Sequence, residues 1–179
     1  MIWESSYWKD DLLKSAELFS KKEKQVIWPD RSLANIEKDL FFGFYAIRKL
    51  MESKTLSTST DKMKIRAASY PIHDKKKVHL YNRRRADELY DFSKKRREDL
   101  SVRFVSNQVI HSYVFNLCFT PKNRLRSILI CSDKERNKRV FEISLKSVIR
   151  IFKIIGRDYP TTSQSKFNPA VGDYEVIQN

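Results

Sequence analysis

The chain has 179 residues, a formal net charge of +14 and a hydrophobic fraction of 41%. This length fits one domain, and we expect a single domain over residues 1–158 followed by an extended C-terminal tail over residues 159–179. No apolar run approaches the roughly 18 residues that cross a bilayer, and the N-terminus lacks the basic and apolar regions of a signal peptide. These absences predict a cytoplasmic protein that has no membrane partner.

The positive charge is concentrated in one part of the sequence. Residues 1–52 hold nine Lys or Arg and nine Asp or Glu, whereas residues 53–179 hold 27 basic and 13 acidic side chains. A segregated basic surface is typical of proteins that bind nucleic acid or another polyanion, and such binding weakens as salt increases. The alternative interpretation is that the excess charge only keeps the protein soluble.

Two amphipathic helices are predicted in the neutral N-terminal part. Apolar residues recur at helical spacing over residues 5–26, and this pattern ends before Pro29 because proline disfavours helix in the residue that precedes it. A second helix is predicted over Ser32–Ser53, where apolar residues recur at three- and four-residue steps. Residues 54–62 are polar and rich in Ser and Thr, so we expect a loop there.

The remaining elements are predicted from their apolar spacing. Short strands are expected at Met63–Ala67 and Val78–Tyr81, followed by helices at Arg85–Phe92 and Leu100–Tyr113, strands at Val114–Thr120, Leu125–Cys131 and Arg139–Ile143, and a helix at Leu145–Ile155. This order predicts an α+β fold in which a helical bundle carries a small three-stranded antiparallel sheet.

The two cysteines lie in the first two strands of that sheet. If these strands form a hairpin through the turn at residues 121–124, Cys118 faces Ser127 and Cys131 faces Val114. The cysteines are then not opposite each other, so a cross-strand disulfide is not expected. No second cysteine pair or neighbouring histidine pair completes a zinc site, and neither a metal ion nor a cofactor is expected.

Three basic runs between residues 75 and 97 are the candidate nucleic-acid-binding residues. Tyr81, Tyr90 and Phe92 lie between them and could stack on bases if they are exposed. The alternatives are that these aromatic side chains belong to the core and that the last run is a solvated loop. The candidates are Lys75, Lys76, Lys77, Arg83, Arg84, Arg85, Lys94, Lys95, Arg96 and Arg97.

A candidate catalytic group lies on the predicted helix Leu100–Tyr113. Arg103, Asn107 and His111 follow one another at four-residue spacing, so they share one side of that helix. An imidazole can accept or donate a proton near neutral pH, and an arginine can stabilise the charge that develops on a phosphate. The alternative interpretation of His111 is a hydrogen-bonded structural residue.

Two segments, EKDLFFGFYAIRKLMES in the second helix and the later SNQVIHSYVF, resemble the HEPN (higher eukaryote and prokaryote nucleotide-binding) helical families. These families include many ribonucleases of toxin–antitoxin, abortive-infection and CRISPR systems, and their active site usually forms where two copies meet. Asn107 and His111 match the polar residue and the histidine of the family motif, whereas Ser106 stands where the motif has arginine, so the motif is degenerate. The resemblance implies a homodimeric, metal-independent ribonuclease in which His111 transfers protons, Asn107 positions it, and Arg103 or Arg48 supplies the missing cation.

The sequence leaves three functions open, and it does not decide whether the protein is an enzyme. The first is a HEPN-like, nucleic-acid-associated bacterial protein, which would be a metal-independent RNase in a defence or toxin–antitoxin setting if it is catalytic. The second is a non-catalytic module that binds nucleic acid, with RNA favoured over DNA, through residues 75–97. The third is a structural subunit that binds an acidic protein partner.

Overall fold

The computed structural model describes residues 2–179 and contains six helices, a five-stranded antiparallel sheet and a two-stranded sheet. The helices are α1 (Ser5–Lys22), α2 (Asp30–Glu52), α3 (Thr58–Asp61), α4 (Ala86–Leu89), α5 (Val102–Ile110) and α6 (Leu145–Gly156). The strands are β1 (Lys64–Pro71), β2 (Arg96–Ser101), β3 (Ser112–Phe119), β4 (Leu125–Ser132), β5 (Arg139–Ser144), β6 (Ser163–Asn168) and β7 (Asp173–Gln178). None of the helices in this part of the chain is both long enough and apolar enough to cross a membrane.

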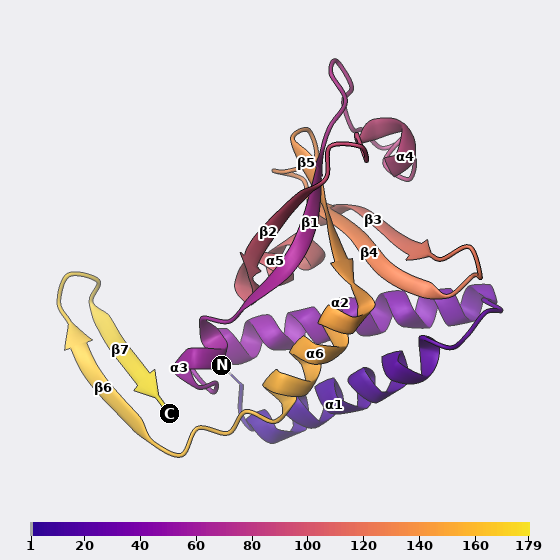
Figure 1. Ribbon diagram of the computed structural model, residues 1–179. Coiled ribbons are helices and arrows are strands. Elements are labelled where there is room, and N and C mark those ends of the chain that lie inside the picture. Colours follow the sequence, from indigo (N-terminus) through magenta and orange to yellow (C-terminus); the bar gives the residue numbers. More distant parts are fainter. Residues whose placement is uncertain (1) are drawn as a thin grey trace.

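The architecture is a sheet standing on a layer of helices (Figure 1). The strand order is β2-β1-β5-β4-β3, with every neighbouring pair antiparallel. Cys118 lies opposite Ser127 and Cys131 opposite Val114, and both cysteines are free. The two pairings predicted for the cysteines of the β3–β4 hairpin are therefore confirmed, although a register shift next to the turn places Phe119 opposite Leu125.

The predicted helical bundle with a three-stranded sheet is wrong. The sheet has two further strands, because β1 extends to Pro71 and residues 96–101, expected as a charged loop and the start of a helix, form β2. Strand β2 has the sequence RREDLS, and it is a strand because its backbone pairs with β1, with Ala68 opposite Arg97. Residues 78–81 form no strand, and α5 is shorter than expected because its predicted last residues begin β3.

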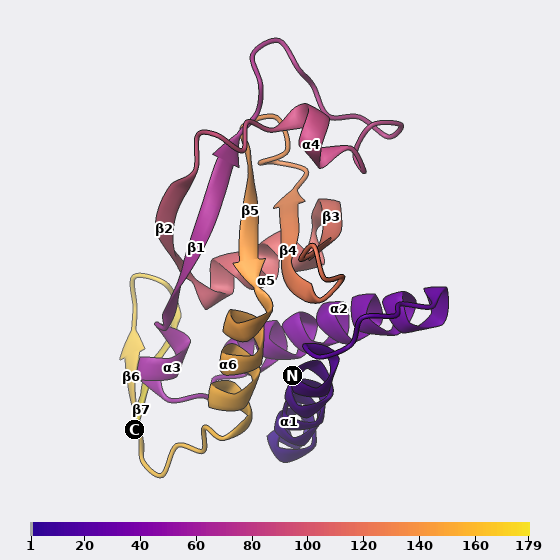
Figure 2. The same ribbon diagram turned by 45° about the vertical axis from the view of Figure 1, so that its right-hand side comes forward.

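The helical layer is held together by aromatic packing. Helix α6 packs along α1, and α2 runs across both of them in the view of Figure 2. The Phe152 ring of α6 is fully buried, with its centroid 5.7 Å from that of Phe19 in α1 and 5.4 Å from that of Phe44 in α2. Gly43 lets the Phe152 ring approach the α2 backbone, because a Cβ atom at Gly43 would lie 2.2 Å from the ring atom Cζ.

The two faces of the five-stranded sheet are covered differently. Helix α5 packs on one face, where the Phe104 ring meets the Phe141 ring edge-on at 5.2 Å, and it lies behind the sheet in Figure 2. On the other face, residues 72–95 cover the end near α4, where the buried Tyr90 hydroxyl donates a hydrogen bond to the Arg136 carbonyl oxygen at 2.8 Å. The rest of that face, toward α6, carries no helix, and we call it the open face.

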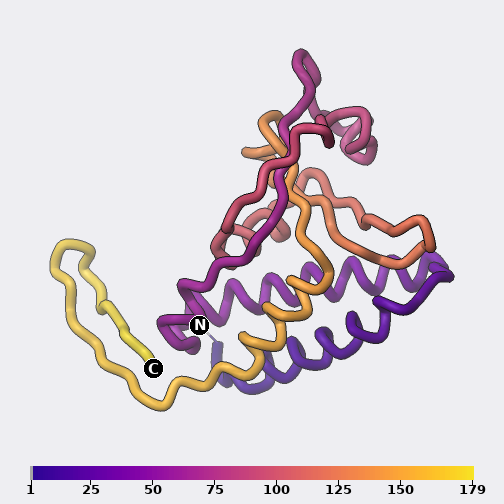
Figure 3. Tube along the Cα trace, viewed as in Figure 1, coloured from indigo at the N-terminus to yellow at the C-terminus, as the bar shows by residue number. Residues whose placement is uncertain are grey.

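Residues 159–179, expected as an extended tail, contain a hairpin of β6 and β7. This hairpin, which we call the arm, projects from the body on the side away from β3 (Figures 1 and 3). The Phe167 and Tyr174 rings of the arm contact each other at 5.2 Å, and the two residues are 50% and 59% exposed. The arm thus leaves apolar surface in contact with solvent.

Candidate functional site

The open face of the sheet contains a basic cleft of about 380 Å³. Small residues on three strands form its floor, so the sheet surface is hollow where larger side chains would fill it; these residues are Ala67, Ala68, Ser127 and Ser144. Tyr70 and Glu142 also line the cleft. Four cations surround them, namely Arg66, Lys95, Arg97 and Arg126.

The carboxylate of Glu142 organises the cleft from the middle of the sheet. It accepts hydrogen bonds from the Tyr70 hydroxyl at 2.6 Å and the Ser127 hydroxyl at 2.7 Å, and it pairs with the Arg126 guanidinium at 3.0 Å. Burial opposes its ionisation, but the hydrogen bonds from Tyr70 and Ser127 and the charges of Arg126 and Lys95 outweigh burial, so the pKa of Glu142 lies below its usual value. Glu142 is therefore ionised at neutral pH and poorly suited to accept a proton.

The Tyr70 hydroxyl is likewise fixed as a hydrogen-bond donor. Burial, together with the bond to the Glu142 carboxylate, raises the pKa of Tyr70 well above its usual value. A protonated tyrosine next to an ionised glutamate holds two neighbouring strands, β1 and β5, in register across the cleft. The pair contributes a rigid floor and leaves charge recognition to the surrounding cations.

Replacing Glu142 by Gln should lower the free energy of unfolding by about 1–3 kcal/mol near neutral pH, because it weakens charge-assisted hydrogen bonds. The pKa of Glu142 is lowered in the folded state, so its stabilisation is present above the ordinary value of 4.5 and is lost as the pH falls below it. Urea unfolding at about pH 7 and about pH 3 should therefore show a large difference between wild type and variant that shrinks in acid. An equal difference at both pH values would contradict a role for the carboxylate charge.

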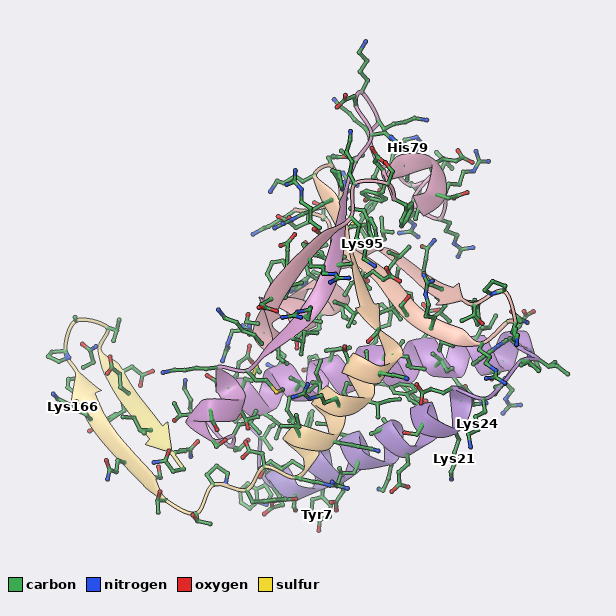
Figure 4. All side chains as sticks on the ribbon, in the orientation of Figure 1. Tyr7, Lys21, Lys24, His79, Lys95 and Lys166 are labelled. Carbon is green, nitrogen blue, oxygen red and sulfur yellow. The ribbon has the colours of Figure 1, made fainter. Side chains whose placement is uncertain are left out.

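The cations of the cleft lie beside an accessible aromatic surface. The Phe92 ring, 40% exposed, contacts the Tyr70 ring at 4.6 Å, and the Lys95 ammonium lies 6.0 Å from the Tyr70 ring centroid. In Figure 4, Lys95 lies over the sheet, far from Lys21 and Lys24 on the helical layer. Aromatic rings next to cations can stack on unpaired bases while the cations contact phosphates.

The fold separates the three basic runs that the sequence places close together. Lys95 and Arg97 line the cleft at β2, whereas the turn that contains Arg84 lies at the opposite edge of the sheet, where its carbonyl oxygen accepts a hydrogen bond from the Asn116 side chain at 2.9 Å. Residues 75–77 are exposed in the loop between β1 and α4. Of the ten candidates, Arg85 pairs with Glu88 and Lys94 with Asp91, and the other eight form no ion pair among the described residues.

No side-chain hydrogen bond joins the four candidate catalytic residues to one another within residues 2–179. His111 is exposed and follows the last residue of α5, and within residues 2–179 no hydrogen bond joins its side chain to that of Asn107, which is half-buried, or that of Arg103. Arg103 pairs with Asp61 at 2.8 Å, and Arg48 pairs with Glu52 at 2.6 Å. Each arginine thus has its own carboxylate.

Sequence reasoning missed Arg66, Tyr70, Arg126 and Glu142 as members of the site. They lie on β1, β4 and β5, up to 76 positions apart in the chain, and only strand pairing brings them together. The local sequence signal for the cleft is the short stretch of small residues in β1, Ala67 to Ser69, because small side chains leave a hollow on the sheet surface.

Comparisons with known proteins add no relative: no family model, curated protein or solved structure matches the chain. Within residues 2–179 no three His, Cys, Asp or Glu side chains are grouped closely enough to hold a metal ion. The functional argument therefore rests on the geometry and charge of the cleft.

Proposed function

We propose that the protein is a module that binds single-stranded RNA through the basic cleft of its open sheet face. The observation that carries this proposal is the group of four cations around a hollow beside Tyr70 and Phe92. Four cations around one hollow suit a phosphate backbone, and the exposed Phe92 ring suits a base that is not paired. In a duplex the base faces are stacked and cannot reach this ring.

The same geometry favours binding over cleavage. Glu142 is ionised and accepts three hydrogen bonds from protein side chains, and the arginines expected to assist His111 are paired with Asp61 and Glu52. A cleavage site would need a proton acceptor and a free cation directed at one phosphate. The HEPN-like relationship, a bacterial defence or toxin–antitoxin setting and action in the cytoplasm are further hypotheses, supported by the sequence features described above.

We expect labelled single-stranded RNA to bind with an affinity that falls about 50-fold between about 50 and about 200 mM salt. This figure follows from four phosphate contacts, each of which contributes a slope of about −0.7 on single strands. Fluorescence anisotropy in the presence of EDTA measures the affinity, and gel analysis of the same samples detects cleavage. The variant His111→Ala should bind like wild type, and duplex RNA of the same length should bind more weakly.

Three outcomes would change this proposal. Absence of salt-sensitive binding would contradict it and leave an acidic protein as the better partner. Metal-independent cleavage that His111→Ala abolishes would replace the binding module by a ribonuclease. Tighter binding of duplex than of single-stranded RNA would remove the proposed role of the aromatic rings.

A further inference from the structure

The two edges of the five-stranded sheet differ in charge. Strand β2, at one edge, has four charged residues in succession, Arg96 to Asp99, which is a usual protection of an edge strand against pairing with other chains. Strand β3, at the other edge, runs from Ser112 to Phe119 without a charged residue. Within residues 2–179 it pairs only with β4, so its outer backbone groups are free to pair with a further strand.

A groove of about 540 Å³ follows this free edge. Five residues of β3 line it, and its walls are α2 on one side and the turn containing Arg83 and Arg84 on the other. The Phe115 ring lies in the groove and contacts the Phe41 ring of α2 at 5.0 Å. Neighbouring strands in a sheet lie about 4.8 Å apart, so the groove can accept one extended segment along β3.

The arm is a strand pair most of whose apolar surface is uncovered, although the end of β7 lines a cleft of about 320 Å³ against α3 and the end of α2. A two-stranded hairpin is marginally stable on its own, and Val171, Tyr174 and Ile177 of the arm are 70%, 59% and 54% exposed. One hydrogen bond, from the Gln178 amide to the Thr58 hydroxyl at 3.0 Å, joins β7 to the body within the described residues. The arm lies on the opposite side of the molecule from β3 in both ribbon views, so it does not reach the groove of its own copy.

We propose that β7 of one copy pairs with the free edge of β3 in a second copy, and that reciprocal exchange of arms forms a dimer. Charge complementarity favours this occupant, because β7 carries Asp173 and Glu175, whereas the groove carries Arg83 and Arg84 against the single carboxylate of Glu37. Within residues 2–179 neither of these two arginines forms an ion pair.

Direct pairing of two β3 strands is disfavoured by the same charges. Asn116 lies near the middle of β3, and its side chain donates a hydrogen bond to the Arg84 carbonyl oxygen. A two-fold pairing of β3 with its own copy would bring both Arg84 turns to the same part of the interface, where like charges repel. The arm brings carboxylates to that position instead.

The test is the mass of the full chain in solution, measured by analytical ultracentrifugation after nuclease treatment. We expect wild type to sediment at twice the monomer mass at about 50 μM, a concentration that suits contacts of micromolar affinity. The double variants Arg83→Glu with Arg84→Glu and Asp173→Lys with Glu175→Lys should each give monomers. The combination of all four changes should restore the dimer, because it exchanges the two signs of charge.

A matched control is Lys75→Glu with Lys76→Glu, which reverses two exposed lysines in a neighbouring loop outside the groove and should leave the dimer intact. A monomeric wild type would overturn the inference. A dimer that is lost with the arginine changes but kept with the β7 changes would overturn the arm as the occupant. The inference does not depend on RNA binding, since no RNA is present in these measurements.

Discussion

Replacement of Arg66, Lys95 and Arg97 by Gln should weaken the binding of single-stranded RNA about 100-fold near 100 mM salt. The three side chains line the cleft, and each charged hydrogen bond or ion pair to a phosphate is worth about 1 kcal/mol net at a surface. Their combined loss of about 3 kcal/mol corresponds to about two orders of magnitude in the dissociation constant. The slope of the affinity with salt should also become less steep by about two units.

Arg126 is left unchanged in this variant because it pairs with Glu142, and its removal would leave that half-buried carboxylate without its cation. The effect on RNA binding can then be separated from an effect on folding. Arg66 has only a distant partner, Asp99 at 3.7 Å, and Lys95 and Arg97 have none among the described residues. Thermal unfolding of the variant should stay within a few degrees of wild type.

The matched control is the replacement of Lys21, Lys24 and Lys38 by Gln. These lysines are exposed on α1, α2 and the segment between them, and the variant has the same net charge as the cleft variant. It should retain nearly all of the RNA affinity, because none of the three lysines lines the cleft, and Lys21 and Lys24 lie well below Lys95 in Figure 4. Equal losses in the two variants would show that total charge, and not the cleft, determines the affinity.

The parts of the fold that could be predicted are those whose apolar pattern is local. Helices α1, α2 and α6 and the hairpin β3–β4 follow from apolar spacing and lie within a few residues of their expected bounds. Strand β2 could not be predicted, because its sequence is charged and its strand conformation comes from pairing with β1 and from contacts such as Glu98 with Arg139 at 2.9 Å. The charged side chains are tolerated since β2 lies at an edge.

The cleft could be predicted only in part, for a similar reason. Lys95 and Arg97 were candidates because basic runs are visible in the sequence, but Arg66 and Arg126 stand in segments where cations alternate with uncharged residues, so they form no run. Glu142 reads as an ordinary solvent-facing residue of a strand until Tyr70 and Ser127 are placed beside it. Periodicity shows which side chains share a strand face, whereas the order of the strands decides which faces meet.

The helical layer that supports the sheet depends on the close approach of the Phe152 ring to the α2 backbone at Gly43. We therefore expect Gly43→Ala to destabilise the protein by about 1–3 kcal/mol. Alanine favours a helix over glycine by about 1 kcal/mol, so a simple propensity argument predicts the opposite sign. The new Cβ would lie 2.2 Å from Cζ and 2.4 Å from Cε2 of the Phe152 ring. Phe19 and Phe44 pack around that ring, so it cannot move aside without opening the core.

A double-mutant cycle identifies the clash as the cause. Phe152→Ala alone should cost about 3–5 kcal/mol, because it removes a fully buried ring. In that background Gly43→Ala no longer meets the ring, so its effect should change sign and become stabilising by up to about 1 kcal/mol. Urea unfolding of the four proteins, followed by circular dichroism, gives these values. If Gly43→Ala had the same effect in both backgrounds, the approach of Phe152 to α2 would not be what requires glycine.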